Sequence, residues 1–294
     1  MAALKTLIVC LVLIAALVDS TQVFANSARR GPKIVQNLKN VKEETNAQLP
    51  RHFNRIFPAP PLNPSAKAAY NFAVDVSAYG SASTFACIYK QGYEAVFIQA
   101  YSPSGGGSLN PNLIQNLNNA ATANLGTEIF VTPYPGKSGS TQFDTVFNAL
   151  KNSGINVRSI WLQVTSPVNW SNNMQININV IQDFIGRANS NGVSAGVYTN
   201  WYEWQQITGS ITTFSNLRLW YWNYSGPGSN GESNANFNDF TGFAGWTQPA
   251  AKQFASNESL CGMTLNRNVY PAGSKAVKQE NKNVDKKLTV GGFV

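Results

Sequence analysis

Histidine is almost missing from this 294-residue chain, which contains a single one, His52. One histidine disfavours Ser/His/Asp triads, Cys/His dyads and metal sites built on histidine ligands. Charged residues are also scarce, at 12% of the chain, whereas hydrophobic residues make up 43%. Because that hydrophobic share is enough to build a core, a wholly disordered chain is excluded. The chemistry left to the protein rests on carboxylates, amides and tyrosines.

Long apolar runs are missing beyond the first residues. Thr6 to Val18 is apolar, Lys5 precedes it, and small or polar residues follow as far as Ala25. This run is too short for a bilayer core of about 30 Å. The pattern predicts a signal peptide over residues 1–25 and no stable membrane span, with a signal anchor as the alternative. We therefore expect a secreted, extracellular protein, with lysosome-like vesicles as an alternative destination.

The net charge of +8 comes from the two ends of the chain. Residues 21–65 carry seven basic side chains against two acidic ones, and residues 273–294 carry five against two. We interpret 26–65 as a basic, proline-containing linker or pro-segment and 273–294 as a flexible basic tail. Because this charge is not organised on a folded face with aromatic side chains, nucleic acid is not a predicted partner. Attraction to anionic cell surfaces stays open.

Cysteine is scarce, with three residues in all. Cys10 lies in the N-terminal apolar run, which leaves Cys87 and Cys261 as an even pair. Paired cysteines in an oxidising compartment form disulfides by default. We predict a Cys87–Cys261 disulfide.

Short apolar runs alternate with helical patterns over residues 66–272. The predicted strands cover 72–76, 95–100, 127–131, 159–164, 194–198, 217–222, 252–255 and 264–265. Helices are predicted over 83–90, from Asn110 to Gly126, over 141–153 and over 175–191. This alternation implies a parallel sheet and favours an α/β fold, a single irregular (β/α)8 TIM-like barrel. The alternative is an open doubly wound sheet, but no GxGxxG motif follows the first strand.

In such a barrel the functional groups gather at the carboxyl ends of the strands. Asp75 stands at the end of the first strand, within an apolar run where burial raises the pKa of a carboxyl group. Glu203 and Glu258 are placed on the same face of the barrel. Asp75 is thus the first catalytic candidate, and either glutamate is a candidate partner. For both glutamates, a solvated loop carboxylate is the alternative.

Aromatic residues concentrate in the second half of the predicted barrel. All seven tryptophans lie between residues 161 and 246, beside several tyrosines. Aromatic faces with polar neighbours suit sugar rings, although core packing explains some of them equally well. The candidate glycan-binding residues are Gln99, Tyr101, Gln163, Tyr198, Trp201, Trp222 and Asn266.

Four segments carry a resemblance to a known family. They are AVDVSAYGSASTFACIYKQGYEAVFIQAY, IWLQVTSPVNW, GVYTNWYEWQQI and KQFASNESLCGMTLNRNVY. Together they resemble the secreted nematode branch of the glycoside hydrolase family 25 lysozymes over about residues 70–271. The resemblance implies a barrel that cleaves the β-1,4 bond between muramic acid and glucosamine units of bacterial peptidoglycan. It also implies a role in antibacterial defence or digestion, without metal or cofactor, and we expect a monomer.

The resemblance aligns one carboxylate of the family with a carboxylate of this chain and the others with residues that are not acidic. The strand-one aspartate of the family falls on Asp75, but its Asp-x-Glu motif falls on Gln163-Val164-Thr165, and its last-strand Asp-x-Asn on Asn266-Arg267-Asn268. Glycoside hydrolysis commonly needs two carboxylates. Two hypotheses follow: a lysozyme whose acid is Glu203 or Glu258, or a barrel that binds glycan through Asp75, Gln163 and Gln99 without cutting it.

Overall fold

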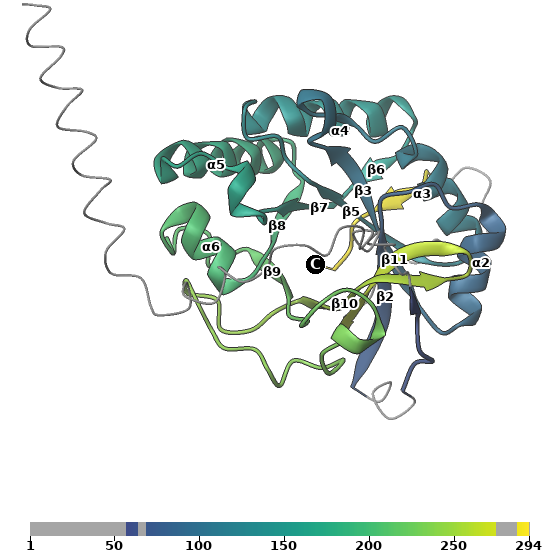
Figure 1. The fold of residues 1–294 in the computed structure, drawn as a ribbon. Coiled ribbons are helices and arrows are strands. Elements are labelled where there is room, and N and C mark those ends of the chain that lie inside the picture. Colours follow the sequence, from purple (N-terminus) through teal and green to yellow (C-terminus); the bar gives the residue numbers. More distant parts are fainter. Residues whose placement is uncertain (1–56, 64–68, 275–286, 294) are drawn as a thin grey trace, which may run out of the picture. The chain divides into compact units, whose positions relative to one another are not determined.

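The structure is a computed structural model and describes residues 57–63, 69–274 and 287–293. Eight strands of one sheet close into a barrel, in which each strand pairs with the next and the last returns to the first (Figure 1). The barrel strands are β2 (Tyr70–Val76), β3 (Ala95–Ser102), β5 (Gly126–Val131), β7 (Ser159–Gln163), β8 (Ser194–Thr199), β9 (Arg218–Trp222), β10 (Ala251–Leu260) and β11 (Met263–Pro271). Each predicted strand is present, and the irregular barrel is confirmed.

The described residues form five α-helices, which pack along the outside of the barrel (Figure 1). They are α2 (Ala82–Lys90), α3 (Leu113–Thr122), α4 (Gly139–Asn152), α5 (Met174–Ser190) and α6 (Trp201–Thr208). Helices α2, α4 and α5 begin within two residues of their predicted starts. The side chains of Ser81, Ser138 and Asn173 cap them, since each accepts a hydrogen bond from a first-turn N–H. The apolar faces of the helices pack against the outside of the strands in the main hydrophobic core.

Two helices differ from the sequence-based expectation. Helix α3 begins at Leu113 rather than beside Asn110 and ends at Thr122, and Gly126 already belongs to β5. Helix α6 forms where a loop was expected, because the side chain of Asn200 caps it by accepting a 2.8 Å hydrogen bond from the Glu203 backbone N–H.

Strand β11 runs antiparallel to both of its neighbours, while the other neighbouring barrel strands pair in parallel. A two-residue turn, Cys261-Gly262, joins it to β10, and both turn residues have positive φ, 53° and 77°. Such turns match the twist of a hairpin. The expectation of a wholly parallel barrel is therefore wrong at this strand. The predicted Cys87–Cys261 disulfide is present and ties the hairpin turn to α2.

The barrel interior below the site is filled by aromatic and small side chains. They are Ala73, Ala95, Phe97, Phe130, Trp161, Tyr198, Trp220, Ala251, Tyr270 and Phe293. The shorter elements are β1 (Phe57–Pro58), β4 (Ser108–Leu109), β6 (Asn156–Val157), β12 (Thr289–Val290) and the 3-10 turns η3 (Ser104–Gly106), η4 (Pro167–Asn169) and η5 (Ser229–Gly231). No α-helix or strand forms between β9 and β10, over residues 223–250.

The C-terminal residues 287–293 pack against the barrel. Strand β12 pairs with β6, and the Phe293 ring enters the interior, where it stacks on Phe97 with ring centroids 5.3 Å apart. The backbone N–H groups of Gly292 and Phe293 donate to one carboxylate oxygen of Glu128. The expectation of a solvated tail over 273–294 is therefore wrong for these residues, because an aromatic side chain near the terminus fills the base of the barrel. Residues 275–286 and the predicted signal and linker segments as far as residue 56 lie outside the described residues.

Candidate active site

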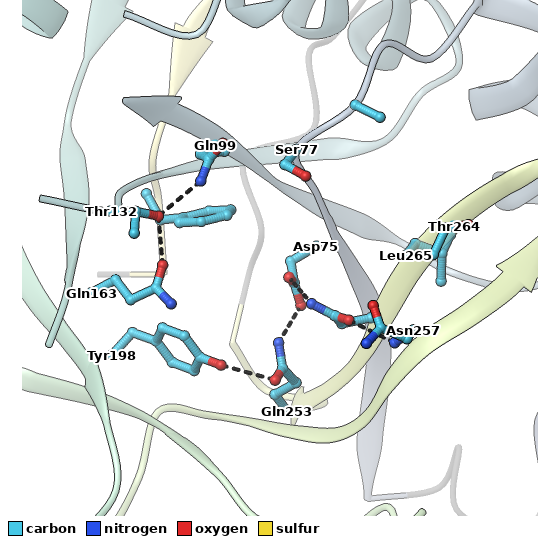
Figure 2. A pocket seen from close by; sticks show the side chains of 13 residues that line it. Asp75, Ser77, Gln99, Thr132, Gln163, Tyr198, Gln253, Asn257, Thr264 and Leu265 are labelled. Carbon is cyan, nitrogen blue, oxygen red and sulfur yellow. Dashed lines mark hydrogen bonds between the residues drawn. The ribbon is translucent and has the colours of Figure 1, made fainter. Parts of the chain in front are cut away.

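A pocket of about 360 Å³ opens at the carboxyl ends of the barrel strands (Figure 2). Of the ten predicted site residues, five line it: Asp75, Gln99, Gln163, Tyr198 and Asn266. The strand ends of an α/β barrel thus bring together side chains that are as much as 191 residues apart in the sequence. The polar atoms of the lining are mostly amides and hydroxyls, and Asp75 is the only carboxylate among its lining residues.

Three amide side chains hold the Asp75 carboxylate. Gln253 and Asn268 donate to Oδ1 at 2.8 and 2.7 Å, and Asn266 donates to Oδ2 at 2.7 Å. Asp75 is 5% exposed, so burial raises its pKa, while the three donors act in the opposite direction by favouring the ionised form. The three donors therefore fix the orientation of the carboxyl group at the floor of the pocket. Its charge depends on the balance between burial and these hydrogen bonds.

The amides around Asp75 are themselves oriented by donors. The Tyr198 hydroxyl donates to Gln253 Oε1 at 2.8 Å, and the Trp220 indole N–H donates to Asn268 Oδ1 at 2.9 Å. With both carbonyl oxygens engaged, both NH2 groups face the aspartate. Gln253 and Asn268 were not among the predicted site residues. Asn268 had a usable signal, because residues two apart in a strand share a face and Asn266 was a candidate.

A chain of uncharged side chains forms another wall of the pocket (Figure 2). Gln99 Nε2 donates to the Thr132 hydroxyl at 2.8 Å, and that hydroxyl donates to Gln163 Oε1 at 2.6 Å. Gln163 Nε2 in turn donates to the Thr165 hydroxyl at 2.9 Å. These groups can hold the hydroxyl groups of a sugar. Neither glutamine can donate a proton to a leaving group, since an amide does not titrate in this range.

Glu203 lies beside the point where β7 ends. Its Oε1 accepts a 2.7 Å hydrogen bond from the Ser166 backbone N–H, and its Oε2 accepts one of 2.7 Å from the Trp222 indole N–H. The residue is 8% exposed, and burial raises its pKa against the effect of these two donors. Glu203 does not line the main pocket.

Electrostatics nevertheless links Glu203 to Asp75. Both carboxylates raise the pKa of the Tyr198 hydroxyl, and both raise that of the Tyr224 hydroxyl. Both carboxylates therefore lie within electrostatic reach of the same two phenols. Glu258, the other candidate acid, raises the pKa of neither tyrosine.

Glu258 lies elsewhere. It is fully buried in β10, does not line the pocket, and its Oε2 contacts Arg267 Nη1 at 3.3 Å. Glu232 bonds to the same guanidinium, and burial together with this neighbouring carboxylate raises the pKa of Glu258. The expectation that Glu258 faces the groove is not met, because the bulges in β10 shift the register between Gln253 and Glu258 and place the latter in a buried ion-pair cluster.

The remaining predicted binding residues lie outside the main pocket. Tyr101 is 2% exposed and packs in the main core under Gly107. Trp201 and Trp222 line a second, smaller pocket, which adjoins Glu203 through the hydrogen bond from the Trp222 indole. Within the described residues, no group of three or more histidine, cysteine, aspartate or glutamate side chains is arranged to hold a metal ion. None of the helices described is long and apolar enough to cross a membrane.

Most of this chain is similar to known proteins. A family described as "Lysozyme-like protein 1" matches residues 66–254. Lysozyme-like protein 7 of Caenorhabditis elegans is 44% identical over 254 residues, which cover 84% of this chain and 88% of that protein. Probable GH family 25 lysozyme 2 of Dictyostelium discoideum is 30% identical over 200 residues, covering 67% and 90%.

A solved structure shares the fold at low sequence identity. The family GH25 lysozyme from Aspergillus fumigatus matches with a TM-score of 0.51 and 15% identity, over 68% of this chain and 93% of that one. The family match and the identity to the nematode proteins both cover most of the barrel. The chain belongs to the nematode-type lysozyme-like proteins of glycoside hydrolase family 25.

Proposed function

We propose that this protein is a secreted, monomeric glycosidase of the lysozyme type, which cleaves the glycan strands of bacterial peptidoglycan in defence or digestion. We further propose that Asp75 and Glu203 are its two working carboxylates. The proposal rests on the position of the Glu203 carboxylate, which accepts a hydrogen bond from the backbone N–H of Ser166, the residue that follows Thr165. Thr165 occupies the position at which the family resemblance expects the principal acid.

In this mechanism protonated Glu203 donates its proton to the glycosidic oxygen, and the bond from that oxygen to the anomeric carbon breaks. The raised pKa of Glu203 favours the protonated acid that this step needs. The electron pair of the broken bond stays on the leaving oxygen, and positive charge develops on the sugar ring. Ionised Asp75, held by its three amides, stabilises that charge. Water then adds to the anomeric carbon and returns a proton to Glu203.

The wall of uncharged side chains that contains Gln99, Thr132 and Gln163 has a separate role in this proposal. Gln99 and Gln163 hold sugar hydroxyls and orient the ring over Asp75. A second candidate function follows from the same wall: a barrel that binds glycan without cutting it. The observation that favours it is that the two donors on Glu203 stabilise the ionised form, which cannot act as an acid.

One experiment separates the two functions. The purified protein and its Asp75→Asn variant are incubated with insoluble peptidoglycan, and new reducing ends are counted along with protein retained on the pellet. The glycosidase predicts reducing ends from the wild type and a loss of turnover in the variant, with retention kept. Retention of both proteins with no new reducing ends from either would establish the binding function and overturn the enzymatic one.

A further inference from the structure

A second pocket, of about 170 Å³, lies between the start of α6, the end of β9 and residues 239–243. Its aromatic lining consists of Trp201, Tyr221, Trp222, Phe240 and Phe243. Trp201 is 60% exposed, so its indole face is available to a ligand. A pocket that combines aromatic faces with polar groups fits a ring that has apolar CH faces and polar edges.

Trp222 connects this pocket to the carboxylate that we propose as the acid. Its indole N–H donates to Glu203 Oε2 at 2.7 Å, which fixes the ring, and its other neighbour is Tyr224 with ring centroids 4.9 Å apart. Glu203 therefore adjoins the second pocket through Trp222. Glu203 is linked to the main pocket as well, because Glu203 and Asp75 both raise the pKa of Tyr198, which lines that pocket.

The charges at the second pocket do not favour an anionic ligand. The Asp239 carboxylate accepts hydrogen bonds from the Tyr221 hydroxyl at 2.6 Å and from Asn223 Nδ2 at 2.7 Å, and it pairs with Lys252 at 2.6 Å. These partners lower the pKa of Asp239 despite its partial burial, so it is ionised at neutral pH. The Lys252 ammonium is buried and also bonds two backbone carbonyls, so it does not face the pocket. An anionic group therefore finds no cation among the lining residues, while a hydroxyl or amide N–H finds an acceptor.

The lining of the second pocket contains no lysine or arginine, and Asp239 is the one charged side chain in it. We propose that the second pocket binds one neutral N-acetylhexosamine ring of the strand on which Glu203 acts. In an alternating strand this ring is the glucosamine unit, because the lactyl group of the muramic acid unit bears either a free carboxylate or a stem peptide with its own carboxylates. The proposal rests on the proposed function for the identity of the strand, but the binding itself does not require cleavage.

The test measures binding of neutral N-acetylglucosamine oligomers of one to six units by calorimetry, on the full-length Glu203→Gln protein. The protein is prepared without N-linked glycans, because Asn223 lines the pocket and begins an Asn-Tyr-Ser acceptor sequence. Trp201→Ala removes the exposed ring, and Thr241→Trp fills the pocket from an exposed position. Tyr202→Ala is the matched control, since Tyr202 is a 52% exposed aromatic on the same helix that does not line the pocket.

We expect affinity to rise with oligomer length until both pockets are spanned. Trp201→Ala and Thr241→Trp should then weaken binding of the longest oligomers by roughly 3- to 10-fold, leave single-sugar binding nearly unchanged, and differ clearly from Tyr202→Ala. Equal affinity of both pocket variants and the control for every length would overturn the proposal. Reducing-end release by the wild type is measured separately, so that length-dependent binding without cleavage refutes the glycosidase alone, and cleavage without an effect of the pocket variants refutes the second sugar site alone.

Discussion

The Glu203 carboxylate accepts a 2.7 Å hydrogen bond from the backbone N–H of Ser166. Ser166 lies three residues beyond the last residue of β7, Gln163, so this contact places a carboxylate from the first turn of α6 beside the carboxyl end of that strand. In the proposed mechanism this carboxylate is the acid that acts together with Asp75.

Replacement of Glu203 by glutamine should lower the rate of reducing-end release by about 10² to 10⁴, because the amide cannot donate the proton. Thr165→Glu, added to that variant, should recover part of the rate, since it returns a carboxyl group to the family position. Gln205→Ala, at an exposed site of the same helix, is the control and should leave the rate unchanged. An unaltered rate in Glu203→Gln would remove Glu203 from the mechanism.

Replacement of Asn266 by aspartate should raise the pKa of Asp75 further, because a carboxylate in place of a donor 2.7 Å away opposes its ionisation. The titration of Asp75 can be followed by its carboxyl carbon signal in NMR, which does not depend on activity. Asn266→Ala serves as the comparison, since it removes the donor without adding charge. A smaller rise in the alanine variant than in the aspartate variant is the expected order, and the reverse order would contradict the cage of donors around Asp75.

Local patterns were sufficient to predict the strands but not every connection between them. Apolar runs bounded by glycine and polar residues located each of the eight strands, since burial on both faces leaves a continuous apolar signal. Helix α6 was missed because its eight residues, Trp201–Thr208, mix aromatic and polar side chains without a clear apolar stripe. The direction of β11 depends on two positive φ angles at Cys261 and Gly262, which the sequence signals weakly when the first turn residue is cysteine.

The site was predicted where strand ends or the family resemblance mark it, and it was missed where it depends on partners distant in the sequence. Asp75 was found because it stands at the end of a predicted strand, and Gln163 and Asn266 because the motifs of the family fall on them. Gln253 was not, since its role follows from hydrogen bonds to two residues far away in the sequence. The sequence could not decide between Glu203 and Glu258 as the second carboxylate, because helix α6 and the bulges of β10 determine where each carboxylate lies.

Removal of the disulfide by Cys87→Ser and Cys261→Ser together should lower the free energy of unfolding by up to about 5 kcal/mol, since the bridge closes a loop over a separation of 174 residues. Urea denaturation of the double variant against the oxidised wild type measures this loss. Reduced wild type should match the double variant. A double variant as stable as the oxidised protein would show that the hairpin turn and α2 hold together without the bridge.

The C-terminal packing makes a separate contribution to stability. Phe293→Ala should lower the free energy of unfolding by about 3 to 5 kcal/mol, because the ring is 3% exposed and leaves a cavity against Phe97 and Tyr270. Lys287→Ala, at an exposed position of the same segment, should change it by less than about 0.5 kcal/mol. Similar stability of the two variants in urea denaturation would mean that the packing of Phe293 does not stabilise the barrel.

Glu128 should make the protein more stable in mild acid than in mild alkali. Burial raises its pKa to about 7 in the folded protein, against an ordinary value of 4.5, although the Trp161 indole and the N–H groups of Gly292 and Phe293 favour the ionised form. Its contribution is therefore fully present below pH 4.5 and is lost as the pH rises through 7. The full difference is about 3 kcal/mol.

Urea denaturation at pH 5 and at pH 8 measures this loss in the wild type and in Glu128→Gln. The glutamine variant should be less stable than the wild type at pH 5, because its NH2 group faces donors that need an acceptor. Its own change between the two pH values should be smaller by about 2.5 kcal/mol, since pH 5 already lies above the ordinary pKa of 4.5. The other buried carboxyl groups with raised pKa, Asp75, Glu203 and Glu258, act in the same direction in both proteins and cancel in the comparison. An equal change with pH in both proteins would show that Glu128 keeps one protonation state across this range.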